Sequence, residues 1–204
     1  GLLFPSTTSV YGSQSEVVDE TCTDEELKPQ SPYAEYKLKS EQMLQEMGEN
    51  HGLKFITCRF GTIFGVSIGM RFHTAVNKFC WQAVMGQPLT IWKTAMDQKR
   101  PYLDLSDAIR AIMHILTNDL FDNRTYNVLT LNATVRDIID EIKIHIPDLE
   151  LQFVESAIMN QLSYEVADDR FKETGFMPKG ELRRGIKDTI EPVSYTHLTL
   201  PTKA

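Results

Sequence analysis

The fold and chemistry of this chain are decided by the stretch Ser31-Pro32-Tyr33-Ala34-Glu35-Tyr36-Lys37. Ser31 suits the N-cap of a helix, because its hydroxyl can accept a bond from a free N–H of the first turn, and Pro32 suits the first helical position. Tyr33 and Lys37 then share one face of that helix. A phenol loses its proton near pH ~10 in water, and a nearby ammonium favours the phenolate. The pair is therefore a candidate for proton transfer.

An isolated Tyr-x-x-x-Lys match is also typical of an ordinary surface pair on an amphipathic helix. The surrounding predicted elements must therefore decide between a surface pair and a proton-transfer pair. Short apolar or alternating runs predict strands at 2–8, 53–59, 89–92, 125–129 and 149–154, the first of them buried. Helical patterns occupy 32–50, 72–85, 106–116, 134–146, 166–174 and 181–190. Ser106 is the expected N-cap of the third helix, and Thr134 with Asp137 resembles a capping box. Residues 13–30 and the segment with Gly61, Gly65 and Gly69 predict loops. This alternation is typical of a parallel α/β sheet, followed here by a less regular, smaller α/β lobe.

Composition narrows the class of protein. The chain has 204 residues, 42% of them hydrophobic, and a net charge of −7, which argues against a nucleic-acid-binding surface. No apolar run approaches the ~20 residues that span a bilayer. The three cysteines, Cys22, Cys58 and Cys80, are widely spaced and predict reduced thiols of a cytoplasmic protein. The five histidines show no metal-ligand spacing, so no metal site is expected.

Hydroxyl side chains crowd the end of the first predicted strand, at Ser6, Thr7, Thr8 and Ser9. Ligands of open α/β sheets bind at the carboxyl ends of the strands, so this end is a candidate site, although the same hydroxyls also suit a turn. A Gly-x-Gly-x-x-Gly phosphate cradle is not found anywhere in the sequence.

The chain resembles the extended short-chain dehydrogenases/reductases, and within them the NAD-dependent epimerase/dehydratase family that acts on nucleotide sugars. Five motifs stand in that family's order: Ser6-Thr-Thr-Ser-Val-Tyr-Gly12, Ser31-Pro-Tyr33-x-x-x-Lys37, Arg59-Phe-Gly-Thr-Ile-Phe-Gly65, Arg100-Pro-Tyr-Leu-Asp-Leu-Ser-Asp107-Ala and Tyr126-Asn-Val. The later Asp168-Asp-Arg-Phe-Lys and Gly175-Phe-x-Pro178 resemble the family's C-terminal signature, and the resemblance covers residues 1–192.

The resemblance implies catalytic roles for three residues. Tyr33 is the expected acid/base, and Lys37 is expected to bind the nicotinamide ribose of NAD, or of NADP, and to assist Tyr33. Thr7 stands where the family places a Ser or Thr that hydrogen-bonds the reacting oxygen. Arg59 and Thr62 are expected near the cofactor, although Arg59 can also be purely structural and Thr62 replaces a common Asn.

Five further residues are expected to bind substrate: Thr8, Ser9, Arg71, Asn77 and Arg100. Arg100 matches a family arginine that contacts the substrate diphosphate, a task that suits its bidentate guanidinium. Arg71 and Asn77 lie where the family binds diphosphate and nucleotide, although the local sequence departs from the usual pattern. Asp104 and Asp107 are expected to be turn and capping residues rather than a catalytic pair, and His73 a packing or hydrogen-bonding residue.

The resemblance also implies a domain division. Residues 1–65 would form the second half of a Rossmann domain whose glycine-rich first half is missing, and residues 66–192 a substrate-binding lobe, with 103–130 returning to the Rossmann sheet. Residues 193–204 break the preceding pattern and resemble translated sequencing-adapter DNA, so we expect a non-native tail.

Three functions fit these observations. The first is an NAD(P)-dependent nucleotide-sugar epimerase, here as an incomplete chain without activity of its own. The second is a reductase or dehydrogenase of another carbonyl substrate that uses the same Tyr33, Lys37 and Thr7. The third is a non-catalytic module of the same fold. The expected ligand is a nucleotide sugar or another small molecule, with neither nucleic acid nor membrane as partner, and the family suggests a homodimer through the Tyr33 helix.

Residues 1–192 alone should not bind NAD appreciably, because a glycine-rich turn and its helix N-terminus supply the pyrophosphate site of a dinucleotide. Calorimetric titration with NAD checks this expectation. Micromolar affinity for this segment would contradict it.

Overall fold

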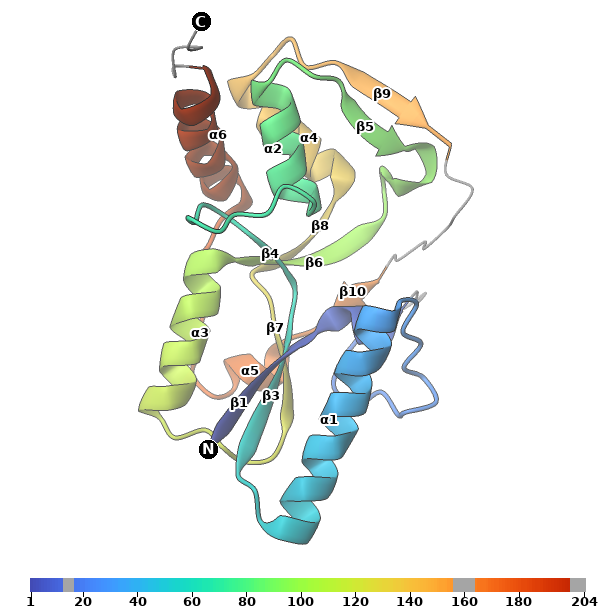
Figure 1. The fold of residues 1–204 in the computed structure, drawn as a ribbon, viewed down its shortest axis with the longest axis vertical. Helices are drawn as coiled ribbons and strands as arrows, with labels where there is room; N and C mark the ends of the chain where they lie inside the picture. The colour runs from blue at the N-terminus through green and yellow to red at the C-terminus, as the bar shows by residue number, and fades with distance from the viewer. Residues whose placement is uncertain (13–16, 156–163, 199–204) are drawn as a thin grey trace, which may run out of the picture.

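The computed structural model describes residues 1–12, 17–155 and 164–198 (Figure 1). Its strands are β1 (Leu2–Thr7), β2 (Val17–Val18), β3 (Phe55–Phe60), β4 (Thr62–Phe64), β5 (Leu89–Trp92), β6 (Lys99–Asp104), β7 (Thr125–Val128), β8 (Leu131–Thr134), β9 (Leu151–Val154) and β10 (Glu165–Val166). Its α-helices are α1 (Pro32–His51), α2 (Ala75–Val84), α3 (Leu105–Thr117), α4 (Val135–His145), α5 (Asp169–Lys172) and α6 (Leu182–Leu198), and short 3-10 helices cover Thr8–Tyr11 (η1) and Lys93–Ala95 (η2).

Helix α1 forms as its sequence predicts. The Ser31 hydroxyl accepts from the Ala34 N–H at 3.2 Å, and Pro32 occupies the first turn, where its missing donor costs nothing. The helix ends at Gly52, which adopts φ +66, a conformation that an L side chain disfavours. Its first two turns, which carry Tyr33 and Lys37, lie beside the carboxyl end of β1 (Figure 1).

The first sheet has the parallel strand order β1-β3-β7. Helices α1 and α3 flank it, and α3 buries Ala108, Ala111 and Ile115 in one cluster with Ile56 and Cys58 of β3 (Figure 1). The expected parallel α/β sheet is confirmed. The expectation that the first strand is buried is wrong for most of its length, because β1 pairs only with β3 among the described strands and Leu2 is 42% exposed.

The remaining elements build a second core. Strands β4, β6 and β8 form one sheet, with β6 and β8 antiparallel, and β5 pairs with β9. Helices α2, α4 and α6 pack against one another in the same part of the molecule (Figure 1). Ile138, Ile139 and Ile142 of α4 are fully buried there, and the predicted Thr134–Asp137 capping box is present.

Several predicted boundaries are wrong for identifiable reasons. The N-cap of α3 is Asp104, whose carboxylate accepts from the Ser106 N–H, so Ser106 lies inside the helix. Helix α2 begins at Ala75 rather than at residue 72, and helix α6 continues through Pro192 to Leu198. The two predicted loops contain β2 and β4, and β6 and β8 were not expected; these short strands are defined by long-range partners that local patterns do not reveal.

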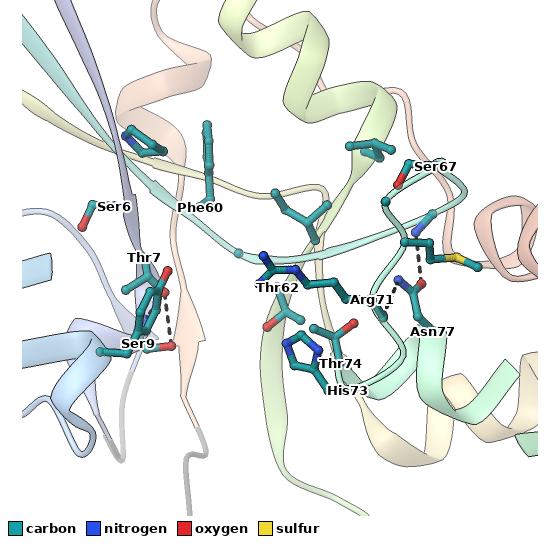
Figure 2. A pocket seen from close by; sticks show the side chains of 18 of the residues that line it. Ser6, Thr7, Ser9, Phe60, Thr62, Ser67, Arg71, His73, Thr74 and Asn77 are labelled. Carbon is teal, nitrogen blue, oxygen red and sulfur yellow. Dashed lines mark hydrogen bonds between the residues drawn. The ribbon is translucent and has the colours of Figure 1, made fainter. Parts of the chain in front are cut away.

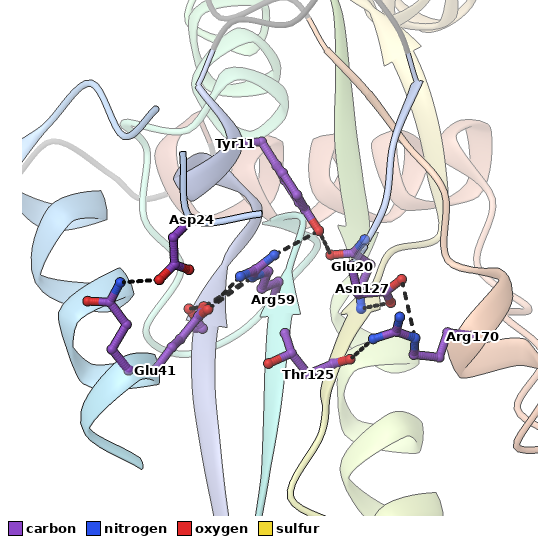
Figure 3. Close-up of polar contacts among 10 residues, drawn as sticks. Tyr11, Glu20, Asp24, Glu41, Arg59, Thr125, Asn127 and Arg170 are labelled. Carbon is purple, nitrogen blue, oxygen red and sulfur yellow. Dashed lines mark hydrogen bonds and ion pairs between the residues drawn. The ribbon is translucent and has the colours of Figure 1, made fainter. Parts of the chain in front are cut away.

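A buried polar network joins α1 to the first sheet (Figure 3). Arg59 of β3 forms an ion pair with Glu41 of α1 at 2.7 Å, and each side chain is 7% exposed. Arg59 also donates to the Tyr11 hydroxyl at 3.0 Å, and Ser6 of β1 donates to Glu41. Burial by itself would lower the pKa of Arg59, but Glu41 and Tyr11 outweigh it and raise that pKa, so the cation is firmly held.

Glu41→Gln should destabilise the chain by about 3–5 kcal/mol, because it leaves the buried Arg59 cation without a counter-charge. The exposed Glu46→Gln on the same helix is the matched control and should change stability by less than about 0.5 kcal/mol. Urea unfolding of both variants measures the difference. Equal losses in the two variants would show that the ion pair does not hold α1.

Candidate functional site

A cavity of about 620 Å³ opens at the carboxyl ends of β1 and β3. One side is made by the end of β1 and the start of α1, and the other by the segment that follows β4 and leads into α2 (Figure 2). Parallel strands end at one edge of a sheet, so side chains distant in sequence meet there. The cavity lies where the sequence predicted a site.

The three predicted catalytic residues line this single cavity. The Lys37 ammonium lies 5.8 Å from the centroid of the Tyr33 ring and donates to the Pro5 carbonyl at 2.6 Å. Thr7 is the last residue of β1, and its hydroxyl donates to the Ser9 hydroxyl at 3.2 Å. The Tyr33 side chain is 59% exposed, which leaves the phenol open to a ligand. A proton acceptor, a cation and a hydroxyl therefore share one end of the cavity.

The opposite wall carries positive charge. Arg71 and His73 line it, together with Asn77, across the cavity from Thr7 and Ser9 (Figure 2). The Arg71 guanidinium has no ion pair or hydrogen bond with any described residue, and no described residue of the cavity wall carries a carboxylate. An uncompensated arginine in a cavity suits an anionic group such as a phosphate.

Arg100 lies in a second cavity of about 260 Å³ rather than in the first. His73 lines both cavities, so the two adjoin at that residue. The second cavity is otherwise mostly apolar and aromatic, with Trp92 and Tyr102 among its walls. The structure thus separates the two predicted substrate-binding arginines, Arg71 and Arg100, into neighbouring cavities.

Thr8, which was expected to bind substrate, and Arg59, which was expected near the cofactor, do not line the cavity. Thr8 is buried, and its hydroxyl donates to the Phe60 carbonyl at 3.3 Å, so it is not part of the cavity wall. Arg59 is engaged by Glu41 and Tyr11 within the polar network and is also absent from the wall. Thr62 lines the cavity, and its contact with a cofactor stays a prediction.

Glu41 is the residue that sequence reasoning missed. It follows Lys37 by four residues, as Lys37 follows Tyr33, so helical spacing already placed all three on one face. Burial of the acid was the missing information, because a Glu in an amphipathic helix normally faces water. Thr74, just before α2, was also missed; it lines the cavity, and its buried hydroxyl has no hydrogen-bond partner among the residues that the structure describes.

The described part of the chain contains no group of three or more His, Cys, Asp or Glu side chains arranged to hold a metal ion. None of its helices is long and apolar enough to cross a membrane. Cys58 and Cys80 are buried free thiols, and burial raises the pKa of each to about 12.

Relatives and solved structures share this architecture. The chain is 28% identical over 197 residues to a trifunctional UDP-glucose 4,6-dehydratase/UDP-4-keto-6-deoxy-D-glucose 3,5-epimerase/UDP-4-keto-L-rhamnose-reductase of Arabidopsis thaliana, a match that covers 91% of this chain and 28% of the relative. It is 32% identical over 131 residues to UDP-glucose 4-epimerase of Azospirillum brasilense, covering 56% of this chain and 37% of the relative. The chain therefore spans a minor part of the length of these two relatives.

Among solved structures, UDP-glucuronic acid 4-epimerase of Bacillus cereus in complex with UDP-glucuronic acid and NAD superimposes with a TM-score of 0.85 at 23% identity, covering 96% of this chain and 62% of that one. Structures similar to this chain hold NAD or NADPH. The family model described as "NAD dependent epimerase/dehydratase family" matches residues 1–128. The expected Rossmann-type α/β fold is thereby confirmed, and the chain belongs to the NAD-dependent epimerase/dehydratase family.

Proposed function

We propose that this chain forms the catalytic and substrate-binding part of an NAD(P)-dependent nucleotide-sugar epimerase. One observation carries the proposal: the Tyr33–Lys37 pair and the uncompensated Arg71 face the same 620 Å³ cavity. Such a cavity can take a sugar hydroxyl at one end and an anionic diphosphate at the other. Relatives named as UDP-sugar epimerases support this choice of substrate.

Tyr33 and Lys37 suit the nicotinamide end of the cofactor. The Tyr33 phenol is exposed and the Lys37 ammonium is half-buried at the cavity edge, so both can meet a ribose hydroxyl. The described residues contain no glycine-rich turn of the kind that holds the pyrophosphate of a dinucleotide. Bound at this end of the cavity, NAD(P) would supply hydride transfer to and from the sugar carbon.

The chain's own residues handle the proton. Tyr33, as the phenolate, accepts the proton of the sugar hydroxyl as that carbon is oxidised, and Lys37 stabilises the negative charge that the phenolate oxygen carries before the transfer. Thr7 hydrogen-bonds the reacting oxygen and keeps it at Tyr33, while Arg71 holds the anionic end of the ligand. Tyr33 returns the proton to the oxygen when the carbon is reduced from its other face, so the reaction has no net redox change.

Tyr33→Phe in the whole protein should lower kcat by about 10²–10⁴-fold, because it removes the proton acceptor with little change in volume. Cofactor affinity should change little, whereas Lys37→Met should weaken both turnover and cofactor binding. Tyr36→Phe is the matched control, since Tyr36 lies on the same helix, is 68% exposed and does not line the cavity. Steady-state kinetics with cofactor titration separate the variants, and a Tyr33→Phe enzyme that kept most of its activity would refute the assignment.

A reductase or dehydrogenase of another carbonyl compound remains the second proposal, because it needs the same Tyr33, Lys37 and Thr7. A panel of nucleotide sugars tested beside simple ketones distinguishes the two enzymes. A non-catalytic module is the third proposal, and cofactor reduction by the whole protein would exclude it.

We further propose that the enzyme is not a 4,6-dehydratase. Loss of water needs an acid for the leaving hydroxyl and a base for the carbon-bound proton. The two residues that follow Thr7 are Thr8 and Ser9, which carry hydroxyls in place of the carboxyl groups that could serve as this acid and base. No described residue of the cavity wall carries a carboxylate either. Glu20, in the acidic loop before α1, has a buried side chain that accepts from the Asn127 N–H.

Incubation of the whole protein with nucleoside-diphosphate hexoses should therefore give epimers of unchanged mass. Mass spectrometry of the sugar products measures this directly. Catalytic accumulation of a 4-keto-6-deoxy product, lighter by one water, would overturn the proposal that the enzyme is not a 4,6-dehydratase. The family assignment would be unaffected.

A further inference from the structure

The wall of the cavity that carries Arg71 is a loop held at its two ends by one side chain. Asn77 lies in the first turn of α2 and is 5% exposed. Its amide oxygen accepts from the Gly65 N–H at 3.3 Å, and its amide nitrogen donates to the Arg71 carbonyl at 3.2 Å. Figure 2 shows Asn77 beneath this wall with both bonds drawn. The two amide atoms thus clasp residues 65–71 as a closed loop.

The loop has little other support among the described residues. Within it, the Met70 N–H donates to the Ser67 carbonyl at 3.1 Å, a bond that closes a turn without tying the loop to the core. Ile68 at its tip is fully exposed, and a side chain added at Gly69 would meet no atom within 4 Å. Gly65 enters the loop at φ +121, which only glycine adopts readily. The position of the loop therefore depends on the Asn77 clasp.

We propose that Asn77 is a positioning residue that sets the affinity for the anionic end of the substrate through Arg71, without touching the substrate itself. This inference rests on the proposed function, in which Arg71 binds a diphosphate. Both polar atoms of the Asn77 amide are committed to backbone, whereas the Arg71 guanidinium is unpaired among the described residues and faces the cavity. The clasp fixes the backbone from which that guanidinium extends, so losing it lets the cation move away from its ligand.

The first measurement needs no substrate. In the whole protein, Asn77→Leu keeps the branched shape and the number of side-chain heavy atoms but loses both bonds, so amide hydrogen exchange across residues 65–71 should accelerate. Gln82→Leu is the matched control, because Gln82 is also a buried amide of α2, but its single bond goes to the Pro88 carbonyl. If Asn77→Leu does not fold, Asn77→Asp keeps the acceptor for Gly65 and loses the donor to Arg71. Unchanged exchange in the loop of a folded Asn77 variant would overturn the clasp.

The second measurement is a double-mutant cycle with UDP as the probe. Asn77→Leu should weaken UDP binding about ten-fold, as expected for a disturbed charge-assisted contact, with kcat nearly unchanged. Arg71→Gln should also weaken binding, and adding Asn77→Leu to Arg71→Gln should cost nothing further. Gln82→Leu should leave UDP affinity unchanged. Additive losses in the double variant would overturn the inference, because Asn77 would then act independently of Arg71.

Failure of the proposed function gives a different result. If the wild-type protein bound no UDP and turned over no nucleotide sugar, the diphosphate assignment would fall, and the role of Asn77 in substrate affinity with it. If the wild type bound UDP but the cycle were additive, the proposed function would stand and only the positioning role would be overturned.

Discussion

The buried Arg59–Glu41 ion pair is the interaction on which the site depends. A charge removed from water must be partnered, and Arg59 finds its partner on α1 rather than on its own sheet. Ser6, which also donates to Glu41, directly precedes Thr7, and Glu41 stands two helical turns after Tyr33. One polar network therefore fixes the distance between the end of β1 and the helix that carries Tyr33 and Lys37. The more exposed hydrogen bond from Lys37 to the Pro5 carbonyl also joins these two elements.

How much of this could be predicted from sequence depends on the range of each interaction. The caps of helix α1 and the Thr134 capping box each depend on residues within about one turn of each other, so local sequence predicts them. The structure contains both. The parallel sheet and the end of β1 follow from the order of local patterns. The Arg59–Glu41 pair, the inward turn of Thr8 and the separation of Arg71 from Arg100 depend on tertiary packing. Sequence spacing does not encode that packing, so those features were missed.

The charge distribution limits the chemistry that this cavity can perform. Cations stand at both ends, with Lys37 beside Tyr33 and Arg71 opposite, while carboxylates such as Glu41 and Glu20 are turned into the structure and engaged by other groups. Such a cavity favours an anionic ligand and a proton shared with a phenol, and it lacks a carboxylate base among the described wall residues. The proposed transient oxidation at a hydroxyl-bearing carbon needs such a proton acceptor together with a hydride acceptor, which is the role proposed for NAD(P). The role proposed for Asn77 also concerns the placement of charge, because its amide holds the backbone from which the Arg71 cation extends.

The central claim is that hydrogen leaves the sugar carbon as hydride and returns to the same carbon, while Tyr33 moves only the hydroxyl proton. Carrying out the reaction of the whole protein in deuterium oxide tests this claim most directly, because only hydrogens that pass through water exchange with solvent. The account predicts epimerised sugar without deuterium on any ring carbon, measured by mass spectrometry and proton NMR. Deuterium at the inverted carbon would contradict it, because that carbon-bound hydrogen would then have left as a proton to a base.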